Sequence, residues 1–234
     1  MSLNDYLYDL RKQNLSYSQT LQDVFALLCN DYKTEGICLD LGSSGPYKHC
    51  NNTLLLQLFN WKSFSVDIEE NSEDWSKFPN NKFYKKNCTS KEDMDSVFFD
   101  LPPLIDFLSL DIDGATLACL KLIDLDKYKF KCICIEHNKY LGDRGTQRFE
   151  QREILQKAGY ILILKNWGTA NFPYEDWYIH PNFVDYKKVQ HLKDLPPFCE
   201  NYDLNSFSLN HVNKINLQKK KFNKETLQLL TEDK

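Results

Sequence analysis

Along most of the chain, short apolar runs alternate with segments whose apolar residues recur at helical spacing. The runs have the length of buried strands, and the intervening segments present one apolar face. Strands that alternate with helices favour a mostly parallel sheet covered on both faces. We therefore predict an α/β fold with a mostly parallel central sheet and helices on both faces. The predicted strands are 37–41, 64–66, 82–87, 104–110, 131–135, 160–164 and 177–179, and the predicted helices are 21–28, 53–59, 91–97, 115–125 and 146–159.

Length and composition favour one globular domain with short appendages. The 234 residues are 42% hydrophobic and 14% aromatic, which is enough to bury one core. We expect a helical lead-in over residues 1–36, the α/β domain over 37–198 and a polar extension over 199–234. No apolar run reaches the roughly 20 residues of a membrane span, and the first residues lack the apolar centre of a signal peptide. We therefore expect a cytoplasmic protein with no membrane span.

Charge and cysteine spacing argue against some classes of function. The net charge of −4 argues against a nucleic-acid surface, which would gather basic residues. The eight cysteines include no C-x-x-C pair, so we interpret most of them as core thiols rather than zinc ligands or disulfides. Cys132 and Cys134 alternate with isoleucines, which predicts that both thiols lie on one face of a buried strand.

A glycine-containing turn follows the first predicted strand. It reads Gly42-Ser43-Ser44-Gly45, and the second strand ends on Asp67 at close to the spacing found in nucleotide-binding sheets. There, glycine lets the backbone approach the ligand, and an acid at the end of the second strand accepts hydrogen bonds from ribose hydroxyls. The full G-x-G-x-x-G pattern is absent, so a turn that only closes the strand is the alternative. The pattern predicts a site for an adenosine-containing cofactor.

Polar side chains recur where the predicted strands end. In open α/β sheets, ligands bind outside the carboxyl ends of the strands, so these residues are expected to meet around one site. The strand-end residues are Asp40 with Gly42, Asp67, Asn87, Asp111 with Asp113, and Glu136 with His137 and Asn138.

The fourth and fifth predicted strands end in the residues best suited to chemistry. Asp111, Asp113 and Glu136 bring three carboxylates to one point, and His137 adds an imidazole. Such a group suits a hard divalent cation held by the carboxylates, substrate hydroxyls, or a proton acceptor. Helix capping explains Asp113 as well, but not Glu136 and His137. We predict His137, Asp111 and Asp113 as catalytic, with His137 as the preferred general base, and Asp111, Asp113 and Glu136 as metal ligands.

Several motifs in order resemble one enzyme family. Ser18-Gln19-Thr20-Leu21-Gln22-Asp23 is similar to an S-Q-x-x-Q-D segment, and Leu39-Asp40-Leu41-Gly42 to the strand and turn that follow it. Asn52-Thr53 followed by Asn60-Trp61 resembles S-N-T followed by G-W. The segment 106–115 resembles D-F-L-K-I-D-x-E-G-A. From about residue 17 to 180, the chain resembles the FkbM family of S-adenosylmethionine-dependent methyltransferases.

The resemblance implies a Rossmann-like class I methyltransferase fold and a set of cofactor contacts. It implies that Asp40, Gly42 and Ser43 surround the methionine part of S-adenosylmethionine, that Asp67 binds the ribose, and that Asn87 and Cys88 lie near the adenine. The further implied cofactor-binding residues are Gln19, Asn52, Thr53, Ile68 and Asp111.

The chain departs from the family in two ways. The turn after the first strand is poor in glycine, and Asp113 replaces the usual Glu. Other sugar O-methyltransferases of this fold hold magnesium with strand-end carboxylates, so the resemblance leaves open a requirement for Mg²⁺.

The resemblance implies methyl transfer to a hydroxyl of a carbohydrate or glycosylated metabolite, in surface-glycan synthesis such as capsule or lipopolysaccharide. The partner is then a small-molecule or glycan acceptor, and a homodimer is left open. Two alternatives stand: a catalytically inactive adenosine-binding interaction module, and a nicotinamide-dependent sugar-nucleotide oxidoreductase. Four aromatic residues either line an acceptor pocket or pack in the core: Trp167, Tyr174, Trp177 and Tyr178.

Overall fold

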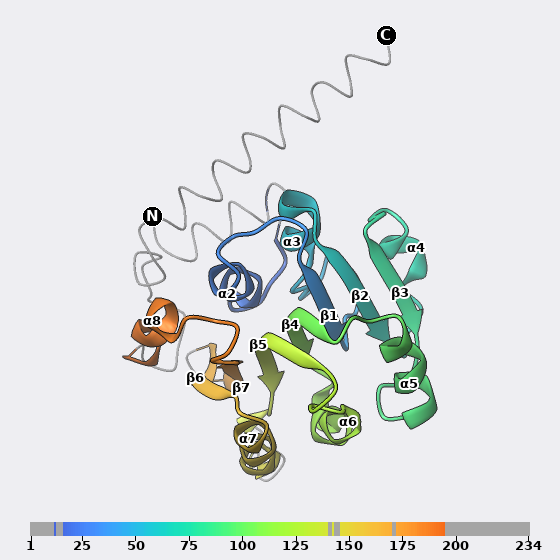
Figure 1. Ribbon diagram of the computed structural model, residues 1–234. Coiled ribbons are helices and arrows are strands. Elements are labelled where there is room, and N and C mark those ends of the chain that lie inside the picture. The colour runs from blue at the N-terminus through green and yellow to red at the C-terminus, as the bar shows by residue number, and fades with distance from the viewer. Residues whose placement is uncertain (1–11, 13–15, 140–141, 143–145, 170–171, 195–234) are drawn as a thin grey trace.

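A seven-stranded sheet forms the centre of the computed structural model, which describes residues 12, 16–139, 142, 146–169 and 172–194 (Figure 1). The strand order is β3-β2-β1-β4-β5-β7-β6. Strands β1 to β5 run parallel, and β7 lies antiparallel between β5 and β6. The predicted α/β fold with a mostly parallel sheet is confirmed. The strands are β1 (Ile37–Leu41), β2 (Lys62–Asp67), β3 (Asn81–Lys85), β4 (Leu104–Leu110), β5 (Lys129–Glu136), β6 (Ile161–Thr169) and β7 (Phe172–Ile179).

Helices cover both faces of this sheet (Figure 1). One face carries α2 (Gln22–Cys29), α3 (Thr53–Phe59) and α8 (Tyr186–Val189), which continues into the 3₁₀ helix η3 (Gln190–Asp194). The other face carries α5 (Lys91–Phe99), α6 (Thr116–Leu122) and α7 (Gln147–Lys157). The short α4 (Ser72–Trp75) packs beside β3, and the 3₁₀ helix η1 (Asp113–Ala115) leads into α6.

Side chains alternate between the two faces of the central strands, which divides the core into two layers. On β1, Leu39 and Leu41 face the layer under α5, α6 and α7, whereas Cys38 faces the layer under α2 and α3. On β5, Cys132 and Cys134 both lie in the α2 and α3 layer, as predicted. The seven described cysteines are free and buried. The five parallel strands, β1 to β5, have their carboxyl ends at the same edge of the sheet, where loops follow them.

The β6–β7 hairpin is longer than the sequence pattern indicates. We predicted strands at 160–164 and 177–179, but β6 extends to Thr169 and β7 begins at Phe172. The pairing contains register shifts between Leu162 and Gly168, and Asn166 has a left-handed φ of 54°. Such irregularities break the period-two alternation on which a strand prediction depends.

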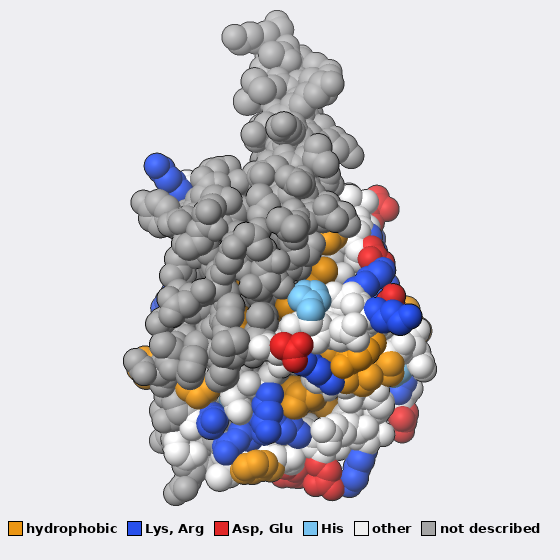
Figure 2. All heavy atoms as spheres, turned by 90° about the vertical axis from the view of Figure 1, so that its left-hand side faces the viewer, with side chains coloured by type: hydrophobic (Ala, Val, Ile, Leu, Met, Phe, Trp, Pro, Cys, Tyr) orange, Lys and Arg blue, Asp and Glu red, His pale blue; other side chains and the backbone are white. Residues whose placement is uncertain are grey.

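The described helices and the face drawn in Figure 2 bear on possible partners. None of the described helices has the length and apolar character needed to cross a membrane. On the described part of the face in Figure 2, apolar side chains mix with lysine, arginine and acidic side chains. This mixture does not indicate an interface, so the homodimer stays a prediction. The extension 199–234 and most of residues 1–15 lie outside the described residues, so the predicted domain division stays a prediction too.

Candidate functional site

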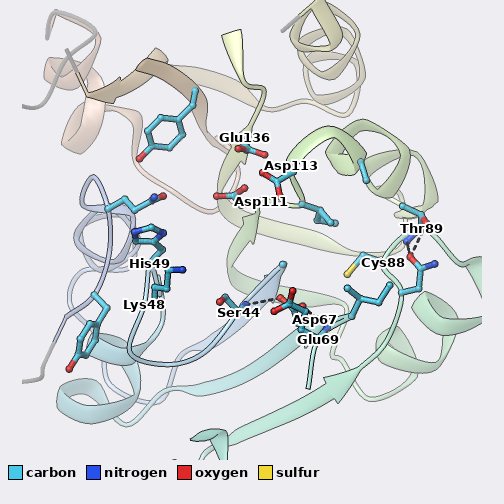
Figure 3. A pocket seen from close by; sticks show the side chains of 18 of the residues that line it. Ser44, Lys48, His49, Asp67, Glu69, Cys88, Thr89, Asp111, Asp113 and Glu136 are labelled. Carbon is cyan, nitrogen blue, oxygen red and sulfur yellow. Dashed lines mark hydrogen bonds between the residues drawn. The ribbon is translucent and has the colours of Figure 1, made fainter. Parts of the chain in front are cut away.

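A cavity of about 1260 Å³ lies at the carboxyl ends of the parallel strands (Figure 3). Its walls come from the loops that follow β1 to β5, from the segment before α2 and from the β6–β7 hairpin. This is the place where open α/β sheets bind ligands. Five predicted strand-end residues meet there, one from each parallel strand: Gly42, Asp67, Asn87, Asp111 and Glu136.

Gly42 allows the ends of β1 and β4 to meet beneath the cavity. Its φ is +85°, and a Cβ atom at this position would lie 1.8 Å from the backbone oxygen of Asp111. Its amide donates a hydrogen bond of 2.9 Å to the carbonyl of Val66, so β2 is tied to the same point. Only glycine fits this backbone without displacing β4.

The carboxylate of Asp67 lies at the end of β2 and binds the backbone of two neighbouring loops. Its two oxygens accept hydrogen bonds from the amides of Ser44 and Glu69, each at 2.8 Å. A carboxylate has further acceptor positions, so these bonds leave capacity for ribose hydroxyls. Ile68 beside it is 66% exposed and lines the cavity, which offers an apolar surface to a flat ring. Cys88, at the end of this wall, lines the cavity as well.

Asp111 and Glu136 form a carboxyl pair on the cavity wall (Figure 3). Burial, together with the charge of Asp111 and the hydrogen bond between the two groups, raises the pKa of Glu136 to about 10. Burial also raises the pKa of Asp111. Glu136 therefore holds a proton at neutral pH, and the residue is only 7% exposed. The Glu136 Oε2 atom is buried and has no hydrogen-bond partner among the described residues.

The predicted magnesium site is not supported. In the described part of the chain, no three Asp, Glu, His or Cys side chains come together in a way that could hold a metal ion. Asp113 lies on the exposed rim with a left-handed φ of 47°. Asp111 and Glu136 instead interact with each other, and their hydrogen bond contributes to the raised pKa of Glu136.

His137 does not face the cavity, in contrast to our expectation for a general base. Consecutive strand residues point to opposite sides, so when Glu136 lines the cavity its neighbour turns away. The His137 side chain is 0% exposed, and its Nε2 lies 3.4 Å from Asp176 Oδ1. Arg152 also binds Asp176, with Nε at 2.6 Å and Nη2 at 2.9 Å. His137 thus belongs to a buried ionic cluster behind the site, and a substrate in the cavity does not reach its imidazole.

Several predicted cofactor contacts lie beneath the cavity rather than on its wall. Asp40 is 3% exposed, and burial raises its pKa to about 7. Ser43 is buried in the turn. Asn52 donates hydrogen bonds to Ser63 and Ser65 at 2.6 and 3.0 Å, and Thr53 donates to the carbonyl of Pro46 at 2.6 Å. These side chains fix the loop between β1 and α3, so they would support a cofactor only indirectly.

The segment before α2 closes the cavity against the β6–β7 hairpin. Thr20 Oγ1 donates a hydrogen bond of 2.5 Å to Glu175, and Thr20 accepts bonds from Tyr174 at its hydroxyl and from Trp167 at its carbonyl. Burial raises the pKa of Glu175 to about 8. Gln19 and Tyr174 line the cavity. Of the other aromatic residues considered for the acceptor pocket, Trp167, Trp177 and Tyr178 are fully buried in the core.

The loop between β1 and α3 forms a wall of the cavity that no sequence pattern predicted. Tyr47, Lys48 and His49 line the cavity from this loop, and Tyr17 packs edge-on against Tyr47 with ring centroids 5.7 Å apart. Irregular loop residues follow no periodic pattern, so only their proximity in the fold assigns them to the site.

Comparison with known proteins shows the fold class and the family of this chain. The fold resembles that of an O-methyltransferase from Bacillus cereus in complex with S-adenosylhomocysteine, with a TM-score of 0.52 at 12% identity over 75% of this chain and 89% of that chain. A candidate O-methyltransferase from Klebsiella pneumoniae gives a TM-score of 0.51 at 12% identity over 75% of this chain and 88% of that chain. At this identity the likeness shows the class I methyltransferase fold alone. No curated protein matches the chain. The methyltransferase FkbM domain matches residues 17–162, which is more than half of the sequence, and the chain therefore belongs to the FkbM methyltransferase family, as its motifs predict.

Proposed function

We propose that this protein is a cytoplasmic S-adenosylmethionine-dependent O-methyltransferase that acts on a hydroxyl of a carbohydrate or glycosylated metabolite in surface-glycan synthesis. One observation carries the proposal: the Asp111–Glu136 pair lies on the wall of a cavity of about 1260 Å³. Sites for one small ligand occupy about 300–1,000 Å³, so a cavity of this size has room for a cofactor and an acceptor.

The residues next to β1, β2 and β3 fit the cofactor. Asp67 offers acceptor positions for ribose hydroxyls, Ile68 offers an apolar surface for the adenine, and Gly42 lets the backbone of the turn lie directly at the cavity. Asn87 and Cys88 would lie at the adenine end. When bound, S-adenosylmethionine supplies a methyl group on a positively charged sulfur.

The carboxyl pair fits the removal of a proton from the acceptor. A neutral hydroxyl is a weak nucleophile, and a neighbouring base increases its reactivity. Asp111 would take the hydroxyl proton as the acceptor oxygen attacks the methyl group that the bound cofactor would supply, with the electrons of the broken carbon–sulfur bond left on sulfur. Glu136, protonated at neutral pH, holds Asp111 in place and donates a hydrogen bond to it. Glu136 is buried and Asp111 is partly buried, which strengthens their interactions with the reacting atoms.

Aromatic side chains on the remaining wall support a carbohydrate acceptor. Tyr17, Tyr47, Phe172 and Tyr174 line the cavity, and Phe172 is 53% exposed. Aromatic faces pack well against the apolar faces of sugar rings, and tyrosine hydroxyls can bond sugar hydroxyls.

The test is transfer of a labelled methyl group from S-adenosylmethionine to a panel of sugars and glycosides, with the wild type, Asp111→Asn and Glu136→Gln compared. We expect transfer to a hydroxyl with the wild type, and turnover lower by roughly 100-fold or more in Asp111→Asn, at unchanged affinity for S-adenosylhomocysteine. Asp113→Asn, on the exposed rim, is the matched control and should keep most of the turnover.

Three results would count against the proposal. Transfer to nitrogen or carbon would reject O-methylation. Cofactor binding without transfer to any acceptor would favour the inactive binding module. Binding of a nicotinamide cofactor in place of S-adenosylmethionine would favour the oxidoreductase.

A further inference from the structure

The loop between β1 and α3 places positive charge on a cavity wall that is otherwise acidic. Lys48 and His49 are the basic residues among those that line the described cavity, whereas the acidic ones come from the ends of β2, β4 and β5. Lys48 is exposed, and its ammonium makes no ion pair or side-chain hydrogen bond with the residues that the structure describes. A charged group at a ligand cavity that no protein group neutralises is available to a ligand of opposite charge.

The backbone that carries Lys48 is held firmly. Thr53 donates a 2.6 Å hydrogen bond to the carbonyl of Pro46, and Trp75 Nε1 donates one of 3.0 Å to the carbonyl of Ser44. His49 has a left-handed φ of 51°, an unfavourable conformation for a residue with a side chain. Strained residues of this kind persist where the surrounding structure fixes them, and they are frequent at ligand sites. Lys48 is therefore presented from a fixed loop, unlike most surface lysines.

Lys48 and His49 lie at the end of the cavity opposite the proposed adenine end. In Figure 3 they are on the opposite side of the cavity from Cys88 and Thr89, with Asp111 between the two ends. Cys88 marks the adenine end of the proposed cofactor site. A ligand that reaches Lys48 and also presents a hydroxyl to Asp111 would occupy the space that remains for the acceptor.

We propose that Lys48, with His49 beside it, binds an anionic group on the acceptor, so that the preferred acceptors are acidic sugars that carry a carboxylate or a phosphate. This inference rests on the proposed function, because it assigns the substrate class of the same site. A hydrogen bond between an ammonium and an oxyanion is strengthened by charge, so it would orient the acceptor as well as bind it. With that anion held at Lys48, a ring hydroxyl of the same sugar is directed at Asp111.

The test measures binding of matched sugars to the full chain in the presence of saturating S-adenosylhomocysteine. The probes are methyl β-glucuronide, which has a carboxylate, and methyl β-glucoside, which lacks it, with glucose 6-phosphate as the phosphate probe. We expect wild type to bind at least one of the anionic probes roughly 10-fold or more tightly than the glucoside. Lys48→Ala should lose this preference, and Lys48→Arg should keep most of it. Lys62→Ala removes the same charge at the other end of β2 and should change nothing.

The outcomes separate this inference from the proposed function. If S-adenosylhomocysteine does not bind the wild type, the proposed function fails, and this inference fails with it. If it binds but the three probes bind equally or not at all, only the acidic-acceptor inference is overturned. The inference is also overturned if Lys48→Ala weakens S-adenosylhomocysteine itself by roughly 10-fold, because Lys48 would then bind the carboxylate of the cofactor.

Discussion

Gly42→Ala tests the claim that the cavity depends on close contact between the ends of β1 and β4. The new Cβ atom would lie 1.8 Å from the backbone oxygen of Asp111, whereas Cβ contacts under 3.0 Å are essentially never found. The two strands would have to separate by about 1.2 Å, the difference between these distances. The hydrogen bond from the Asp111 amide to the Leu41 carbonyl, 2.9 Å long, lies at this point and would stretch.

Two contributions set the expected cost of Gly42→Ala. A residue with a Cβ atom in the left-handed region costs about 1–2 kcal/mol relative to its preferred conformation. Weakening the hydrogen bonds of Asp111 to Leu41 and of Gly42 to Val66 costs about 1 kcal/mol each. The sum is about 3–4 kcal/mol in the free energy of unfolding. For a domain of this size, about 2–4 °C of Tm is lost per kcal/mol, so we expect Tm to fall by roughly 10 °C.

Urea and thermal denaturation of the two variants Gly42→Ala and Gly114→Ala measure this cost. Gly114 is the matched control, because a Cβ atom there meets no atom within 4 Å and its φ is not positive. Its substitution should change stability by less than about 0.5 kcal/mol. Calorimetry should also show weaker binding of S-adenosylhomocysteine to Gly42→Ala, because Gly42 itself lines the cavity and the new methyl group would displace the turn that forms its floor. Equal stability of Gly42→Ala and the wild type would refute the reasoning.

Three further substitutions test individual groups. Asp67→Ala removes a charged acceptor from the proposed ribose site and should weaken S-adenosylhomocysteine by roughly 10- to 100-fold in calorimetry, with a smaller loss in Asp67→Asn; unchanged affinity in both would reject the assignment. Burial alone would raise the pKa of Asp176, but the interactions with His137 and Arg152 lower it to about 2, so ionised Asp176 stabilises the fold above about pH 4 by about 2 kcal/mol. This stabilisation is lost as pH falls through 2, so urea unfolding should show a steeper acid loss in the wild type than in Asp176→Asn, and parallel curves would contradict it. Glu136 affects stability in the opposite direction, because its pKa is raised in the folded protein. As pH rises from 6 to 9, the free energy of unfolding of the wild type should fall by up to about 4 kcal/mol relative to Glu136→Gln. A difference that stays constant with pH would show that Glu136 is ionised throughout.

The sequence predicted the regular elements well because their burial patterns are simple. The predicted bounds of β1, α3 and β4 coincide with those in the structure, and each is a mainly apolar run or stripe next to glycine, proline or asparagine. The β6–β7 hairpin and the short helices α4 and α8 were the exceptions. The left-handed residue of the hairpin, Asn166, and its register shifts have no signature in a period-two pattern.

The strand pattern predicted the site residues that lie at strand ends, but not Lys48 and its neighbours in the loop between β1 and α3. Asp67, Asp111 and Glu136 line the cavity because the carboxyl ends of parallel strands share one edge of the sheet. His137 was misplaced, because one residue's shift along a strand reverses the direction of its side chain. Lys48 was missed, because a loop between a strand and a helix has no periodicity to show which side chains enter a cavity.

Calorimetric titration of the full chain with S-adenosylhomocysteine tests the central claim most directly. We predict one site per chain with a micromolar dissociation constant, a rise in Tm on binding, and no heat of binding with NAD⁺ or NADH. A folded sample that binds no S-adenosylhomocysteine, or that binds a nicotinamide cofactor instead, would contradict the assignment of this cavity to methyl transfer.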